Sequence, residues 1–146
     1  MRNHIRVCLD ISNKNQYKCE AVGISNLINK TRITATDIRN ATGEFVGYYL
    51  HKGQLSIFRD RLGARNIYYD CDSVIGKIYV STDLVWLVTK LKPYLNNGYV
   101  EDEYNNFQVS LHDRTPYHSI FRVMPGTIDH FRMGPEMFVY RDCTTY

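Results

Sequence analysis

The feature that most constrains the fold is a pair of apolar runs, residues 44–50 and 54–60, joined through Lys52 and Gly53. Both runs are rich in Val, Ile, Tyr and Phe, which favour β-strands. A Lys-Gly pair between two such runs is typical of a short hairpin connection, because glycine adopts turn conformations that other residues resist. We therefore expect two adjacent antiparallel strands in the middle of the chain.

Runs of similar composition predict strands elsewhere in the chain. They lie at residues 4–11, 77–81, 127–132 and 136–141. Because sheet dominates the middle and the end of the sequence, we expect an α+β fold with mostly antiparallel sheet.

Helical periodicity is clearest in the segment STDLVWLVTKL, residues 81–91. Ser81 and Thr82 are candidate N-caps, and the segment stops before Pro93, which cannot continue a helix. One face of the expected helix carries an apolar stripe made of Leu84, Leu87, Val88 and Leu91. Further helices are expected at residues 24–30, at 35–41 with Thr34 or Thr36 as cap, and at 101–108.

Composition excludes several classes of protein. A chain of 146 residues is expected to form a single domain over residues 1–146, and no apolar run is long enough to cross a membrane. The net charge of +3 comes from scattered basic residues, so charge alone gives little reason to expect a nucleic acid. The first 20 residues do not resemble a secretory signal, and we expect a cytoplasmic protein. The four cysteines, Cys8, Cys19, Cys71 and Cys143, form no C-x-x-C pair, so we expect reduced thiols, no metal and no cofactor.

Four segments, in this order, are similar to the glutamine-amidotransferase domain that opens asparagine synthetases and β-lactam-forming synthetases. They are GEFVGYYLHKGQLSIFRDRLGARNIYY, YVSTDLVWLVTKL, TPYHSIFRVMPGTIDHFR and FVYRD, and the resemblance is clearest over residues 43–141. It implies the N-terminal-nucleophile hydrolase sandwich, in which two mostly antiparallel sheets are stacked between helices. The residues that carry the motifs structurally are Arg59, Asp60, Gly63, Tyr68, Tyr69, Pro125 and Gly126.

The chain departs from this family in the N-terminal segments that carry the family's catalytic residues. Its nucleophile is a cysteine that is exposed when the initial methionine is removed, whereas here Met1 is followed by Arg2. The stretches that precede the family's glutamine pocket have no counterpart. CLDISN, residues 8–13, resembles the oxyanion segment, but Cys8 replaces its asparagine and Leu9 its glycine, so a side-chain oxyanion donor is missing. No catalytic residue is predicted, and the sandwich is expected to be incomplete.

The resemblance therefore implies a catalytically inactive domain that acts as a binding or regulatory module. The expected partner is a protein, which would be a synthetase-type partner, a missing half-domain or a second copy. A second interpretation is one subunit of a split amidotransferase whose partner supplies the nucleophilic cysteine. The two interpretations differ in one observable respect. A domain that lacks its front should expose an unpaired sheet edge or an apolar face, and a compact monomer with covered edges would remove the main support for the split enzyme. In the family, the loop at residues 59–65 lies near the synthetase partner, which makes Arg65 and Arg61 candidate contact residues.

Within that loop, Asp60 lies between two arginines. A network that joins its carboxylate to guanidinium groups and backbone amides is the simplest interpretation. Gly63 is expected to adopt a backbone conformation that other residues resist.

Three alternatives follow from residue types alone. The first is a small nucleic-acid or anion-binding protein on this scaffold. A nucleic acid could stack on a tyrosine surface beside basic residues, although cross-strand packing is the favoured role of such tyrosines. That surface would consist of Tyr48, Tyr49, Tyr68, Tyr69 and Tyr79 with Arg59, Arg61 and Arg65. The set His112, Asp113 and His118 has metal-like types, but a loop before Pro116 explains it equally well.

The third alternative is a cysteine nucleophile. Self-cleavage could expose Cys8 or Cys19 at a new N-terminus, and Cys8 could pair with His51 or His118. Because Cys8 lies in an apolar strand pattern, we expect it instead to be a buried packing residue.

Overall fold

The chain consists mostly of two antiparallel sheets, with two short helices in the described residues. The computed structural model describes residues 4–72, 76–95, 113–134 and 139–146. The four-stranded sheet has the order β1 (Arg6–Asp10), β6 (Lys77–Ser81), β5 (Tyr68–Asp72) and β7 (Phe121–Arg122). The five-stranded sheet has the order β2 (Tyr17–Ser25), β3 (Gly43–His51), β4 (Gln54–Arg59), β8 (Thr127–Met133) and β9 (Val139–Thr145). The helices are α1 (Ala35–Arg39) and α2 (Leu84–Leu91).

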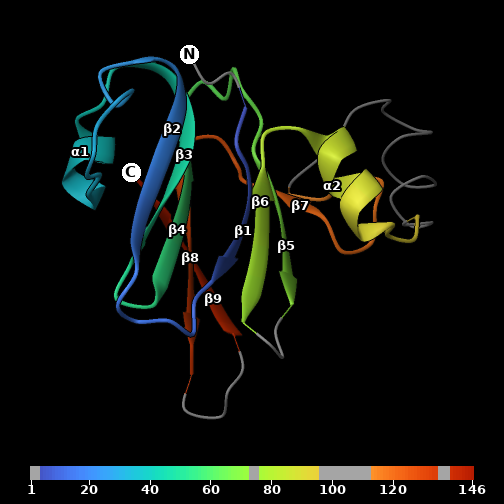
Figure 1. The fold of residues 1–146 in the computed structure, drawn as a ribbon. Helices are drawn as coiled ribbons and strands as arrows, with labels where there is room; N and C mark the ends of the chain where they lie inside the picture. Colours follow the sequence, from blue (N-terminus) through green and yellow to red (C-terminus); the bar gives the residue numbers. More distant parts are fainter. Residues whose placement is uncertain (1–3, 73–75, 96–112, 135–138) are drawn as a thin grey trace.

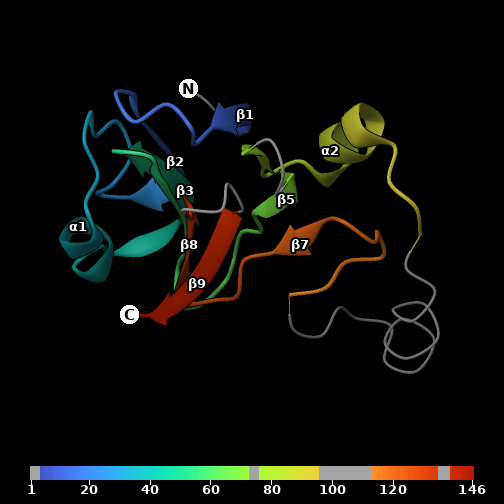
Figure 2. The ribbon, with the colours of Figure 1, turned by 90° about the horizontal axis from the view of Figure 1, so that it is seen from below.

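The two sheets pack face to face around a shared apolar core (Figures 1 and 2). Leu9, Ile78 and Val80 come from the four-stranded sheet, while Leu55 and Ile57 face them from the five-stranded sheet, and all are buried. Because side chains alternate along a strand, the second face of each sheet is free for other contacts. α1 covers that face of the five-stranded sheet, where Ile38 joins a second buried cluster, and α2 lies beside β6 on the opposite side of the molecule (Figure 1).

The predicted hairpin is confirmed. β3 and β4 pair antiparallel, and His51 faces Gln54 across a two-residue turn. Lys52 has φ of 51° and Gly53 has φ of 77°, and two successive positive φ angles are what a tight hairpin turn of matching twist requires.

Both described helices lie where the sequence predicts them. Thr34 caps α1 in a capping box with Asp37. The cap of α2 is Asp83, whose Oδ1 accepts from Trp86 N at 3.3 Å, so the prediction of Ser81 or Thr82 is wrong. Ser81 Oγ instead accepts from the backbone N–H of Asp83, the cap residue itself. Thr82 Oγ1 accepts from Ile5 N and so joins the start of α2 to the residue before β1.

Leu87 of the predicted stripe is buried, and the other three members of the stripe are half-buried. The helix expected at residues 101–108 lies outside the described residues. No helix in the described part of the chain has the length and apolar character needed to span a bilayer.

The helix predicted at residues 24–30 is wrong. β2 continues through Ser25, and the segment after it is a series of turns. Ser25 Oγ accepts from Leu27 N, Asn26 Oδ1 accepts from Thr42 N, and Asn29 has φ of 69°. Side chains that bond to nearby backbone in this way compete with helix formation.

Three strands were not predicted, and a fourth is displaced. β2 was missed because its first half is polar, β5 because Asp70 and Asp72 interrupt its apolar run, and β7 because it has two residues. β9 spans Val139–Thr145 and not 136–141, of which 136–138 lie outside the described residues.

Candidate binding site

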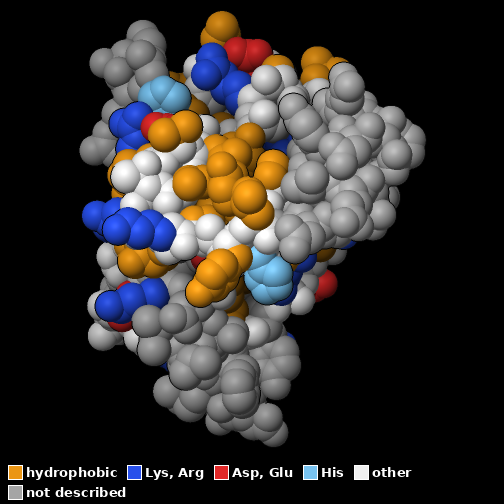
Figure 3. Space-filling view, turned by 90° about the vertical axis from the view of Figure 1, so that its right-hand side faces the viewer, with side chains coloured by type: hydrophobic (Ala, Val, Ile, Leu, Met, Phe, Trp, Pro, Cys, Tyr) orange, Lys and Arg blue, Asp and Glu red, His pale blue; other side chains and the backbone are white. Residues whose placement is uncertain are grey.

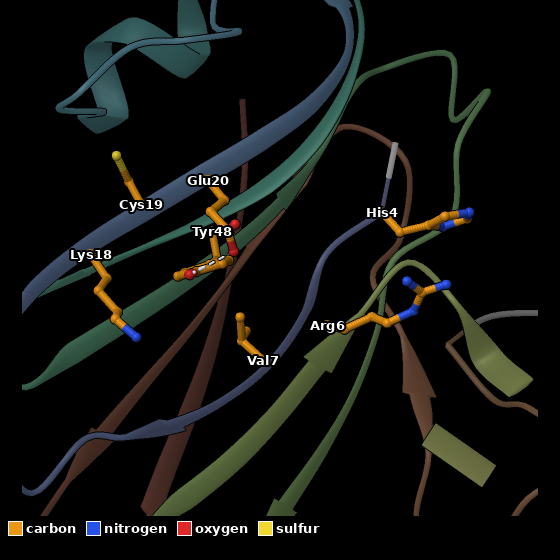
Figure 4. Close-up of a pocket in the computed structure, with 7 residues that line it drawn as sticks. All are labelled: His4, Arg6, Val7, Lys18, Cys19, Glu20 and Tyr48. Carbon is orange, nitrogen blue, oxygen red and sulfur yellow. Dashed lines mark hydrogen bonds between the residues drawn. The ribbon is translucent and has the colours of Figure 1, made fainter. Parts of the chain in front are cut away.

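A cleft opens on the side of the sandwich where β1 and β2 are the edge strands of their sheets. It has a volume of about 520 Å³, and we call it the β1–β2 cleft. Its lining residues are His4, Arg6, Val7, Lys18, Cys19, Glu20 and Tyr48. Figure 4 shows that Glu20 and Tyr48 lie together and that Val7 points toward them from β1. His4 and Arg6 are directed away from this group (Figure 4), because His4 faces Thr82 and Arg6 donates to Asp83 at 2.8 Å.

Two charged side chains of opposite sign lie on the inward face of β2. Val22 faces the core, and the alternation of the strand places Lys18 and Glu20 on the same face. Glu20 Oε2 accepts from Tyr48 Oη at 2.9 Å. Lys18 is exposed and makes no ion pair within the described residues. An ammonium group and a carboxylate therefore stand two residues apart at the mouth of the cleft.

The opposite side of the sandwich, between β7 and β9, is closed by an ion pair. Arg141 of β9 binds Asp113, which precedes β7, and also Asp129 of β8, with N–O distances of 3.2 Å in both cases. Asp129 is only 1% exposed, and the Tyr69 ring lies under the Arg141 guanidinium. The two sides of the molecule thus differ, since an ion-paired arginine lies between β7 and β9, whereas a cleft opens between β1 and β2.

The loop at residues 59–65 is held by hydrogen bonds from two buried side chains, Arg59 and Asp60. Asp60 is 2% exposed, and its carboxylate accepts from the backbone amides of Leu62, Gly63 and Phe45. Gly63 has φ of 66°, and a Cβ at this position would lie 2.6 Å from Pro125. The Asp60 carbonyl accepts from Gly126 N, so Pro125 and Gly126 of the predicted motif meet this loop directly.

Arg59 binds carbonyl groups and not the carboxylate of Asp60. Its guanidinium donates to Arg65 O at 2.8 Å, to Val123 O at 3.0 Å and to Gly63 O at 2.6 Å. Burial lowers the pKa of Arg59. The prediction that backbone amides bind the Asp60 carboxylate is therefore confirmed. The prediction that a guanidinium group binds it is wrong for Arg59, which donates to backbone carbonyls instead.

The two candidate contact residues have partners within the chain. Arg65 pairs with Glu44 at 3.1 Å and is half-buried. Arg61 is exposed, lies over the Tyr146 ring and donates to Tyr146 O. Leu62 between them is 89% exposed, so the tip of this loop presents an apolar side chain that the sequence analysis did not single out.

A second exposed apolar region surrounds α2. Figure 3 shows hydrophobic side chains gathered on the face that carries this helix. Val85, Tyr94 and Leu95 are each more than half exposed. The sequence leads us to expect an unpaired sheet edge or an exposed apolar face. β2 is an edge strand of this kind, and the surface around α2 is an exposed apolar face.

The five tyrosines do not form one stacking surface. Tyr48 and Tyr69 are buried in the core between the sheets, and Tyr49 packs in the cluster under α1. Tyr68 and Tyr79 lie on the outer face of the four-stranded sheet, as the inward direction of Tyr69 and Val80 requires.

The predicted burial of Cys8 is wrong, because this side chain is exposed on the outer face of β1. His51 lies in the other sheet, with its ring edge-on to Tyr17. Cys19 donates to the carbonyls of Lys30 and Thr31. Of the metal-like set, His112 lies outside the described residues, Asp113 binds Arg141 and His118 is exposed. The described residues contain no group of His, Cys, Asp and Glu that could hold a metal ion.

His130 links three strands on the outer face of the five-stranded sheet. Its Nδ1 lies 2.9 Å from Ser56 Oγ on β4, and its Nε2 lies 3.0 Å from Thr144 Oγ1 on β9. Ser56 is fully buried, so its hydroxyl is not exposed to solvent, whereas His130 is half-buried. Burial lowers the pKa of His130.

This pKa shift predicts a pH dependence of stability. Because the folded state binds the proton less tightly than the unfolded chain, the contribution of His130 is complete above the unfolded pKa of about 6.5 and is lost as the pH falls through it. The melting temperature of the His130→Asn variant should therefore fall by less than that of the wild type when the pH drops from about 7.5 to about 5.5. Thermal unfolding monitored by circular dichroism measures this difference. Equal losses in the two proteins would contradict the prediction.

No protein-family model matches the chain, and no curated protein matches it significantly in sequence.

Proposed function

We propose that this chain is a non-catalytic binding module, built on a sandwich that resembles the glutamine-amidotransferase domain of asparagine synthetases. Its binding surface is the open side formed by β1, β2 and the β1–β2 cleft. Two stacked antiparallel sheets, the β3–β4 hairpin and the buried loop at Asp60 and Gly63 support the resemblance.

The observation that carries the proposal is that β2 is an edge strand beside an open cleft. It is an edge strand whose inward face ends in Lys18 and Glu20 beside an open cleft, where apolar side chains would otherwise continue the core. Edge strands present unpaired N–H and C=O groups, which are a template for pairing with another chain. The position of Cys8 supports the non-catalytic part of the proposal, because its side chain points away from the cleft.

The second candidate function is one part of a split amidotransferase, and the same free edge of β2 favours it. Strands of another polypeptide that begins with cysteine would add beside β2 and complete the catalytic front. The two functions make different predictions about chemistry, because only the split enzyme would release ammonia from glutamine after that polypeptide is added.

A glutaminase assay tests the non-catalytic proposal. The purified chain with L-glutamine should release ammonia at the rate of buffer alone, and the Cys8→Ala and Cys19→Ala variants should behave in the same way. Ammonia release above that rate, abolished by either substitution, would overturn the proposal.

Hydrogen–deuterium exchange of the dilute chain tests whether the open side is available. Amides on the free rim of β2 should exchange much faster than those of β4, which has a neighbour on both sides. Equal protection of β2 and β4 in the dilute chain would contradict a free binding edge.

A further inference from the structure

We propose that two copies of this chain associate through β2, which pairs antiparallel with β2 of the second copy around a two-fold axis at Cys19. This inference rests on the proposed function, because it names a second copy as the partner of the open side. The pairing would join the two five-stranded sheets into one continuous sheet across the axis.

β2 is the longest edge available. It has nine residues, whereas the other edge strands β1, β7 and β9 have five, two and seven. Its backbone bonds to β3 on one side. On the other side, no further backbone–backbone hydrogen bond within the described residues reaches the segment from Tyr17 to Ile24. The free rim is therefore long enough to form a ladder with a second strand.

Charge complementarity selects the register. A two-fold axis at right angles to the sheet keeps the inward faces of both copies on the same side, so residues that share a face must oppose each other. With the axis at Cys19, Lys18 opposes Glu20 of the second copy, and Glu20 opposes Lys18 of the second copy. Opposite charges directly across a strand pair stabilise it, and symmetry produces this contact twice. An axis at Lys18 or at Glu20 would instead place two identical charges face to face.

The same comparison disfavours the other edges. On β9, an axis at Asp142 would oppose two aspartates, and Arg141 already binds Asp113 and Asp129. β1 offers Arg6 and Asp10 in a similar arrangement around Cys8. β1 has only five residues against the nine of β2, however, so it would form a shorter ladder with a second strand.

Inward-pointing charges on an edge strand can also serve to prevent pairing. Protection of that kind is strongest when the charges have the same sign, because they then repel a second copy in every register. Lys18 and Glu20 have opposite signs and a spacing of two residues, which is the spacing that self-pairing around the intervening residue requires.

Reciprocal charge exchange tests this interface. Sedimentation velocity over a concentration series should show a monomer–dimer equilibrium for the wild type, with weak affinity because a single strand pair buries a small interface. Lys18→Glu and Glu20→Lys each convert two attractive contacts into repulsive ones, so each should raise the dissociation constant about tenfold or more. The double variant, Lys18→Glu with Glu20→Lys, should restore wild-type association.

Three further experiments test the same interface. An equimolar mixture of the two single variants should form the mixed dimer, because each supplies the charges that the other lacks. Lys14→Glu makes the same change in net charge as Lys18→Glu, but in the loop before β2, and should leave association unchanged. Mild oxidation should cross-link the wild type and Cys8→Ala as dimers but leave Cys19→Ala uncross-linked.

A chain that stays monomeric throughout the series would overturn this inference, and so would a dimer that neither Lys18→Glu nor Glu20→Lys weakens. Either result would leave the non-catalytic binding module intact, because that proposal fails only if glutamine is hydrolysed or the β2 rim is protected in the dilute chain.

Discussion

Replacing Arg59 with methionine is expected to lower the free energy of unfolding by about 3 to 5 kcal/mol, because a hydrogen bond from a charged donor contributes about 1.5 to 3 kcal/mol and such contributions do not add fully. The Arg59 guanidinium is the shared donor for three backbone carbonyls, those of Gly63, Arg65 and Val123. Methionine has a similar length and no donor, so the change leaves buried carbonyl oxygens without a partner. It also detaches the loop from the segment that precedes β8.

Urea unfolding monitored by tryptophan fluorescence measures this loss, since Trp86 is the single tryptophan in the chain. Arg61→Met is the matched control, because Arg61 lies two residues away and is exposed. Its contacts with Tyr146 are at the surface, so its loss should stay below about 1 kcal/mol. Equal losses in the two variants would mean that Arg59 does not hold the loop in the way described.

The elements that the sequence predicts correctly are those determined by residues close together in the chain. Residues 52 and 53 supply the two positive φ angles of the hairpin, and Thr34 with Asp37 supplies a complete cap for α1. The hydrogen bonds that hold the loop at residues 59–65 could not be predicted from neighbouring residues. Asp60 binds the amide of Phe45, 15 residues earlier, and Arg59 binds the carbonyl of Val123, 64 residues later. Only the folded chain brings these groups together.

The candidate binding site was missed for a related reason. The segment before and within the first half of β2, NKNQYKCE, is polar and has no apolar alternation that would reveal a strand. A signal was present in the alternation of Lys18, Glu20 and Val22 with Tyr17, Cys19 and Ala21. It became interpretable only when Val22 was found in the core, since that contact establishes which face the two charges share.

The second large effect is expected at the closed side of the sandwich, where Arg141→Met should lower the free energy of unfolding by about 3 kcal/mol. Asp129 is 1% exposed, and Arg141 is its only ion-pair partner within the described residues. One of its oxygens, Oδ1, already has no hydrogen-bond partner there. Removing Arg141 therefore leaves a buried carboxylate without compensation, which costs far more than the loss of an exposed ion pair.

The double variant Arg141→Met with Asp129→Leu separates the cost of an unpaired charge from the cost of lost packing. Replacing both members of a buried pair with apolar residues is often neutral or stabilising, so we expect the double variant to recover most of the loss caused by Arg141→Met alone. Chemical denaturation of the wild type, both single variants and the double variant completes the cycle. If the double variant is as unstable as the sum of the singles, the ion pair does not couple β8 to β9. If most of the stability returns, the ion pair of Arg141 and Asp129 couples β8 to β9, and its charges are stable in the folded chain only because each is opposite the other.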